Sequence, residues 1–180
     1  PPFTLFSGGG SRYGGSIKFI PVLTKPYNFH MHAVKGYEHN GKFRYQVRRQ
    51  INEKIMEKIK QLVYNYAHAV HSQNEKEFKV LWSSKENILI SITDQFTGTD
   101  AIYQDFLIGG IQKCYESIDL VVENIDIRMI DDNKAIVVFK YHTECICRET
   151  HEPYGIQGLE TQIVIKENNQ WKLMHIHYSK

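Results

Sequence analysis

The stretch Trp171-Lys172-Leu173-Met174-His175-Ile176-His177-Tyr178-Ser179 decides the fold of this chain. It predicts a mostly apolar terminal strand. Successive side chains of a strand point to opposite faces, so strict alternation would place Trp171, Leu173, His175, His177 and Ser179 on one face. Two imidazoles and a hydroxyl on such a face suggest the polar floor of a pocket. The competing interpretation is a pair of structural histidines whose polar groups are hydrogen-bonded within the sheet.

The elements before this strand are helical first and extended afterwards. Apolar residues recur at spacings of three and four between about Gln50 and Ser72, which predicts a long amphipathic helix. The remaining expected elements are helices at Glu75–Trp82 and residues 100–116, the latter capped by Thr99 or Asp100, and strands at Ile88–Ile92, Leu120–Ile130, Ala135–Arg148 and Leu159–Lys166. Hairpin turns are expected at Asp131-Asp132-Asn133 and Asn168-Asn169. This order predicts an α+β fold with helices packed on one face of a curved antiparallel sheet.

An N-terminal extension precedes this domain. Residues 1–16 hold five of the twelve glycines, a composition typical of a flexible arm. The Asn40-Gly41 pair between Val34–Tyr37 and Lys42–Val47 predicts a hairpin turn. We therefore expect an arm with a hairpin at residues 1–49, which wraps a neighbouring copy or partner, and a folded domain at residues 50–180.

The composition limits the classes of function. A chain of 180 residues with 42% hydrophobic residues suits one well-packed domain. A net charge of +2 gives no support for nucleic-acid binding, and no apolar run approaches the roughly 18 residues of a membrane span. The odd set Cys114, Cys145 and Cys147 predicts free thiols in a reducing compartment, hence an intracellular location that is cytoplasmic or organellar, with mitochondria included. A Cys-x-Cys pair near His142 is too weak for a zinc site, and we expect no metal or cofactor.

Four motifs, in order and spacing, resemble a known superfamily over residues 50–179. They are Asn74-Glu75-Lys76-Glu77-Phe78 after the long helix, Phe96-Thr97-Gly98-Thr99-Asp100 followed by Phe106, Leu159-Glu160-Thr161, and the terminal Trp…His-x-His-x-Ser. Together they are similar to the nuclear transport factor 2-like superfamily, also called SnoaL-like. The likeness is greatest to the association (hub) domain of calcium/calmodulin-dependent protein kinase II. The resemblance implies a cone in which a bent sheet wraps the long N-terminal helix.

The same resemblance implies several kinds of function. Members pair through the sheet as dimers, hub domains stack these dimers into rings, and many members only bind or scaffold. The hub pocket resembles a basic site for a carboxylate, but Tyr141, Gln162 and Tyr178 stand where that family tends to have arginine. The guanidinium clamp for anions is then absent. The pocket residues implied here are Tyr141, Thr143, Gln162 and His175.

Enzymes of the superfamily supply two alternatives. The ending is similar to that of iota-class carbonic anhydrases, some of which work without metal. Here His177 would order a water or accept a proton, and Ser179 and Tyr103 would donate to an oxyanion. A ketosteroid isomerase or polyketide cyclase would need a carboxylate base in the cone pocket, for which Asp94, Asp100 and Asp105 are the nearby acids, although Asp100 also suits a helix cap.

The interpretation that best fits these patterns is a non-catalytic or weakly ligand-binding assembly domain. It would act as a scaffold through dimerisation or higher oligomerisation, or as a subunit of a larger protein complex. The alternatives are a metal-independent carbonic anhydrase-like lyase, or a SnoaL-like isomerase or cyclase that uses the cone pocket. A small anionic ligand also stays open. Fold alone cannot choose among them.

Overall fold

The computed structural model describes residues 38–180, which form one compact unit. The predicted glycine-rich arm and the segment Val34–Tyr37 lie outside the described residues. The helical elements are α1 (Glu38–Ser72), α2 (Glu75–Lys79), α3 (Thr99–Ala101) and the π-helix η1 (Ile102–Gln112). The strands are β1 (Ile88–Ile90), β2 (Gln95–Thr97), β3 (Tyr115–Asp131), β4 (Lys134–Cys147), β5 (Pro153–Tyr154), β6 (Gln157–Glu167) and β7 (Gln170–Ser179).

The long helix α1 carries the buried stripe that its periodicity predicts. Ile59, Val63 and Tyr66 are fully buried, and the helix ends at Ser72 as expected. It begins already at Glu38, however, so the expected boundary between residues 49 and 50 falls inside it. The predicted strand Lys42–Val47 is wrong, because that segment is helical. Its lysine, arginine and glutamine residues favour a helix, and this preference overrides the turn signal of Asn40-Gly41.

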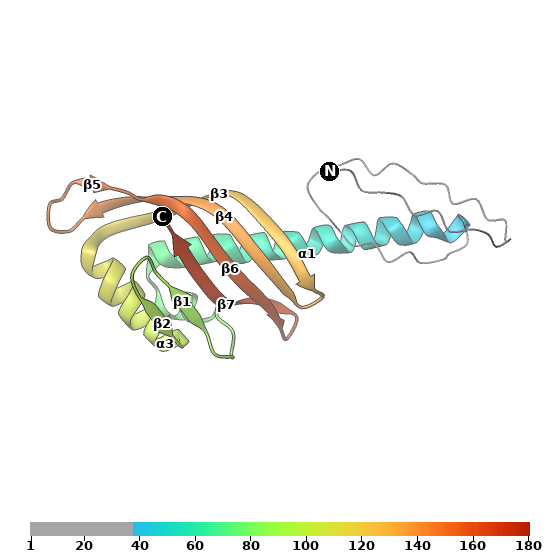
Figure 1. Ribbon diagram of the computed structural model, residues 1–180, viewed down its shortest axis with the longest axis horizontal. Coiled ribbons are helices and arrows are strands. Elements are labelled where there is room, and N and C mark those ends of the chain that lie inside the picture. Colours follow the sequence, from blue (N-terminus) through green and yellow to red (C-terminus); the bar gives the residue numbers. More distant parts are fainter. Residues whose placement is uncertain (1–37) are drawn as a thin grey trace, which may run out of the picture. The chain divides into compact units, whose positions relative to one another are not determined.

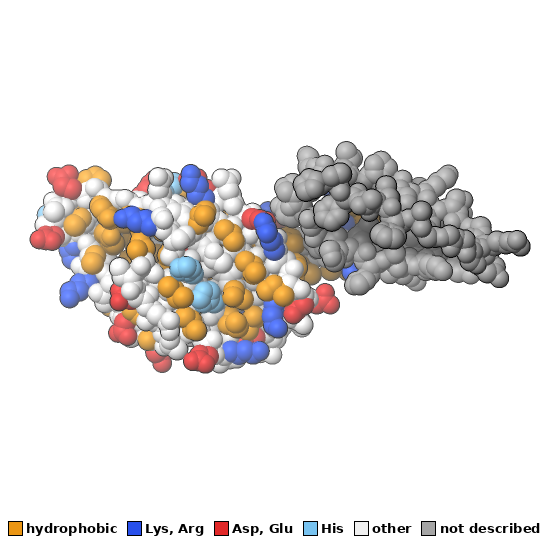
Figure 2. Space-filling model, viewed as in Figure 1, with side chains coloured by type: hydrophobic (Ala, Val, Ile, Leu, Met, Phe, Trp, Pro, Cys, Tyr) orange, Lys and Arg blue, Asp and Glu red, His pale blue; other side chains and the backbone are white. Residues whose placement is uncertain are grey.

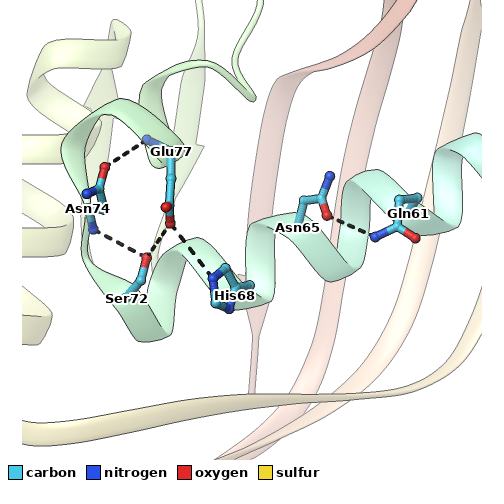
Figure 3. Close-up of polar contacts among 6 residues, drawn as sticks. All are labelled: Gln61, Asn65, His68, Ser72, Asn74 and Glu77. Atoms are coloured by element: carbon cyan, nitrogen blue, oxygen red, sulfur yellow. Dashed lines mark hydrogen bonds and ion pairs between the residues drawn. The ribbon is translucent and has the colours of Figure 1, made fainter.

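A compact set of polar contacts stops α1 and starts α2 (Figure 3). Gln73 has a φ of 53°, the left-handed conformation that commonly ends a helix. Asn74 caps α2, because its side-chain oxygen accepts a hydrogen bond of 3.1 Å from the Glu77 backbone N–H. The Glu77 carboxylate then accepts from the Ser72 hydroxyl at 3.0 Å. These contacts turn the chain so that α2 packs Phe78 into the core.

The sheet has the strand order β2-β1-β7-β6-β4-β3, and β5 pairs with β4. Only the β1–β7 pair among the described strands is parallel. Figure 1 shows the long strands curling around α1, which packs most extensively against β3. The α+β cone predicted from the sequence is therefore confirmed.

The terminal strand does not alternate strictly. Val164 pairs with Leu173 whereas Ile163 pairs with His175, so Met174 is an extra residue in β7 and forms a β-bulge. Trp171 and Leu173 are buried on the inner face, but beyond the bulge Ile176 is the buried residue and His177 is exposed. The prediction that Trp171, Leu173, His175, His177 and Ser179 share one face is wrong, because the bulge reverses the last part of the strand.

The third helix also begins differently from the prediction. Gly98 is its N-cap, with a φ of 85° and no side-chain cap. Thr99 accepts a hydrogen bond of 2.8 Å from the Asn87 amide, and Asp100 forms an ion pair of 2.6 Å with Lys79, so neither residue caps the helix. The helix then continues as the π-helix η1, a rare form that is frequent at functional sites.

Candidate functional site

Polar side chains gather on the inner face of the sheet, where it meets α1. Glu160 and Gln162 project inward from β6, and both are fully buried. Tyr141 on the neighbouring β4 is buried beside them, and Tyr178 on β7 and Tyr66 on α1 complete the set. We call these five residues the interior cluster. Their strand positions explain the grouping, because inward positions of adjacent strands lie side by side.

Glu160 is the titratable centre of the interior cluster. Burial raises its pKa to about 8, while the amide of Gln162 and the hydroxyl of Tyr178 act in the opposite direction. Gln162 Nε2 donates a hydrogen bond of 2.7 Å to Glu160 Oε1. Glu160 is therefore mainly a neutral carboxylic acid at pH 7, so it has a proton to donate.

The tyrosines around Glu160 hold their protons firmly. The hydroxyls of Tyr66 and Tyr178 share a hydrogen bond. Burial, followed by the proximity of Glu160, raises the pKa of both phenols well above the ordinary range. The Tyr141 pKa is raised for the same two reasons. Within residues 38–180, three buried atoms of the cluster have no hydrogen-bond partner: Tyr141 Oη, Glu160 Oε2 and Gln162 Oε1.

Aromatic rings close the cluster toward η1. Tyr178 meets Tyr141 edge to face, with ring centroids 5.6 Å apart, and stacks on Phe106 of η1 at 5.9 Å. Phe106 in turn contacts Phe96 of β2. Two grooves, of about 520 and 370 Å³, lie elsewhere, one beside the β4–β5 hairpin and one along β3 and β4. The interior cluster lines neither of these two grooves. Because Glu160, Gln162, Tyr141 and Tyr66 are at most 1% exposed, the cluster is packed.

The residues expected to form a carbonic anhydrase site do not converge. Tyr103 donates its hydroxyl to the Gln73 carbonyl at 3.1 Å, at the end of α1. Ser179 donates to the Leu159 carbonyl at 3.0 Å, at the edge of the β6–β7 pair. His177 is exposed on the outer face of the sheet. His177 and Ser179 thus lie on the outer face of β7, whereas Tyr103 is buried behind the sheet, so this arrangement does not gather the three around one bicarbonate.

The expected pocket residues divide in the same way. Tyr141 and Gln162 lie together in the interior cluster. Thr143 accepts a hydrogen bond of 3.0 Å from the Ile156 backbone and lines the groove beside β5. His175 is half-buried on the outer face. Glu160 and Tyr66 were not among the predicted site residues. The position of Glu160 in a predicted strand, between Leu159 and Thr161, was the sequence signal for an acid in the sheet.

The outer face of the sheet is the second candidate site. Its outward positions pair across strands from β3 to β1, and aliphatic side chains dominate the middle: Ile88, Ile90, Ile136, Val138, Leu159, Ile163. Leu159 is 50% exposed. Figure 2 shows histidine side chains among apolar ones on this face. We call these aliphatic positions, with His175 and His177, the outer patch.

Residues 38–180 contain no group of three His, Cys, Asp or Glu side chains placed to hold a metal ion. Their three cysteines are free thiols. No helix in the same part of the chain combines the length and the apolar composition that crossing a bilayer requires.

Solved structures similar to this chain share its cone. A nuclear transport factor 2-like superfamily protein from Salmonella enterica serovar Typhimurium is 21% identical and has a TM-score of 0.67, with 71% of this chain and 92% of that chain covered. The hexachlorocyclohexane dehydrochlorinase LinA-type3 from Novosphingobium barchaimii is 11% identical with a TM-score of 0.65, and 71% and 87% are covered. A Xanthomonas campestris protein provisionally assigned as a calcium/calmodulin-dependent protein kinase II association domain is 15% identical with a TM-score of 0.58, and 67% and 84% are covered.

At these identities the likeness shows the fold and leaves the activity open. No curated protein sequence is similar enough to this chain to count as a match. The model of the SnoaL-like domain family matches residues 59–180, which is more than half of the chain. The chain therefore belongs to the SnoaL-like domain family.

Proposed function

We propose that this chain is an assembly domain that pairs with a second copy through the outer patch. The observation that carries the proposal is the contrast between the two faces of the sheet. The inner face is filled by α1 and the interior cluster, whereas the outer patch presents aliphatic side chains that are half-buried or, at Leu159, exposed. Contiguous apolar surface of this kind marks protein interfaces more often than free surface.

The position of the outer patch supports a second copy as its partner. It spans β1, β7, β6 and β4, the middle of the sheet order, so the same face of a second copy can pack across it. A closed dimer through one self-complementary patch is the commonest form of oligomer. The structural neighbour assigned as an association domain agrees with such a role, although its name describes that protein alone.

Sedimentation velocity of the full chain tests the assembly function. We expect a dimer at micromolar concentration, and Leu159→Lys should convert it to a monomer because it places a charge in the patch. Tyr64→Lys is the matched control, since Tyr64 is 49% exposed on α1, away from the sheet's outer face. A wild-type monomer, or equal loss of dimer in both variants, would contradict the proposal.

The interior cluster supports a second candidate, an isomerase- or cyclase-type acid in the cone. A neutral Glu160 beside Tyr141 offers two O–H donors in an apolar interior, which suits a carbonyl oxygen that gains charge. The described residues bury no lysine or arginine, so a neutral ligand fits better than the small anion left open by the sequence. Phe106 would have to move to admit it.

Ligand-observed NMR with small cyclic ketones and phenols tests this second function. Binding that is lost in Glu160→Gln and retained in Ser179→Ala would support the cone site. Binding that both variants retain would place the ligand elsewhere. No binding by the wild type would leave the assembly function as the one that the geometry supports.

A further inference from the structure

Two imidazoles lie side by side in the middle of the outer patch. His175 and His177 both face outward because of the bulge at Met174. His175 sits in register between Ile163 of β6 and Ile88 of β1, and His177 between Thr161 and Ile90. Each imidazole is thus flanked on both neighbouring strands by an aliphatic side chain or a threonine.

Among the described residues, Glu167 is the one carboxylate at an outward position on β1, β6 or β7, and it lies at the far end of β6, four residues or about 13 Å from Ile163. It accepts a hydrogen bond of 3.0 Å from the Ser84 backbone N–H. The other outward residues of β6 are Gln157, Leu159, Thr161, Ile163 and Ile165, and those of β2 beyond β1 are Gln95 and Thr97. The other outward groups on β7 and at its end are Lys172, which donates to the Val80 carbonyl, and Lys180. Protonated imidazoles here would therefore face neutral or positive neighbours.

The nearest acids are distant or already paired. Asp94 lies in the turn between β1 and β2 and accepts a hydrogen bond of 2.6 Å from Thr93. Asp126 lies on β3, three strands from β7, and binds Arg128 at 3.2 Å. Three strand spacings amount to about 14 Å. Glu123, also on β3, binds His142 of β4 at 2.8 Å, and the outward Lys140 on β4 adds positive charge.

We propose that protonation of His175 and His177 releases the second copy from the outer patch, so that pH controls the assembly of this chain. The inference rests on the proposed assembly function. Covering the patch removes both imidazoles from water without supplying a carboxylate, and this penalises their charged form. Partial burial and the neighbouring His177 already lower the pKa of His175. The neutral imidazoles are thus the form that the dimer retains.

The experiment is sedimentation equilibrium of the full chain at pH 8.0, 7.0, 6.0 and 5.5, with circular dichroism at each pH to confirm folding. We expect the dimer dissociation constant to rise about tenfold or more between pH 8.0 and 5.5, because each dimer must keep four imidazoles neutral. In His175→Gln with His177→Gln, the constant should become independent of pH.

The matched control replaces two histidines away from the outer patch, His68→Gln with His151→Gln. Both are mainly exposed and face Glu77 and Glu116, respectively. This control should retain the wild-type pH dependence. A dimer whose constant does not change with pH, tightens in acid, or still weakens in the patch double variant overturns the inference alone. A wild-type monomer at every pH overturns the assembly function as well.

Discussion

The two faces of strand β6 carry contrasting side chains. Its inward side chains, Glu160 and Gln162, are fully buried in a polar cluster, whereas its outward side chains, Leu159 and Ile163, are aliphatic and partly exposed. A stable sheet would ordinarily place these residue types the other way round. The inversion places a costly acid on the inner face and leaves on the outer face the aliphatic surface to which we assign the proposed dimer contact.

Cavity formation should distinguish the two faces most strongly. Phe139 and Val138 are neighbours on β4, but Phe139 is 1% exposed on the inner face and Val138 points outward. We expect Phe139→Ala to lower the free energy of unfolding by about 3–5 kcal/mol. Val138→Ala should cost about 1 kcal/mol or less in the monomer. Urea denaturation at low protein concentration measures both, and equal losses would show that the two faces are packed alike.

The inward and outward positions that this first test compares can be predicted from the sequence. Long regular patterns of apolar residues form the expected helix or strand even after tertiary packing. The stripe of α1 and the alternation along β4 both appear as expected. Short strands such as β2 and β5, of three and two residues, leave no periodic signal and were not predicted.

The titration of Glu160 should give the next largest effect. Its pKa is about 8 in the folded chain against an ordinary value of 4.5, so its contribution to stability is complete below pH 4.5 and is lost as the pH rises toward 8. At pH 7 the loss is about 3 kcal/mol. Glu160→Gln keeps the hydrogen bond with Gln162 and has no proton to lose. We therefore expect this variant to be more stable than the wild type at pH 7 by about that amount.

The difference between the two proteins should become small near pH 4.5 and vanish below it, because Glu160 is protonated in the folded chain and, as the pH falls below 4.5, in the unfolded chain as well. Chemical denaturation of both proteins from pH 4.5 to 8.5 measures it. Glu152→Gln is the matched control, since Glu152 is exposed near β5. A wild-type stability that is parallel to that of Glu160→Gln across this range would show that Glu160 ionises normally.

The candidate sites were harder to predict than the fold, and one residue explains much of the difficulty. The residues Leu173-Met174-His175 do not predict a bulge, since Met174 is as compatible with a regular strand as with an irregular one. A single inserted residue exchanges the faces of every later side chain. The histidines therefore lie in the outer patch and not on the expected pocket floor, and Tyr178 points inward, where its hydroxyl bonds to that of Tyr66.

Removing one phenol hydroxyl from the interior cluster should change the free energy of unfolding by less than the titration of Glu160 does. Tyr178→Phe loses the hydrogen bond to Tyr66 and leaves that hydroxyl buried, which should cost about 1–3 kcal/mol. Tyr66→Phe should cost a similar amount, and the double variant should cost much less than the sum, because both partners are then apolar. Additive losses would mean that the two hydroxyls do not depend on each other.

Ser179→Ala should give the smallest effect of all. Its hydroxyl donates only to the exposed Leu159 carbonyl, which water can satisfy, so the free energy of unfolding should change by less than about 0.5 kcal/mol. Stopped-flow hydration of CO2 provides the second measurement. Because Tyr103 is buried at the end of α1 whereas His177 and Ser179 lie on the outer face of β7, we expect no rate above buffer in the wild type and none in the variant. Fast hydration that disappears in Ser179→Ala would contradict the proposed division into a packed interior and a binding exterior, since it would require these groups to act together on one substrate.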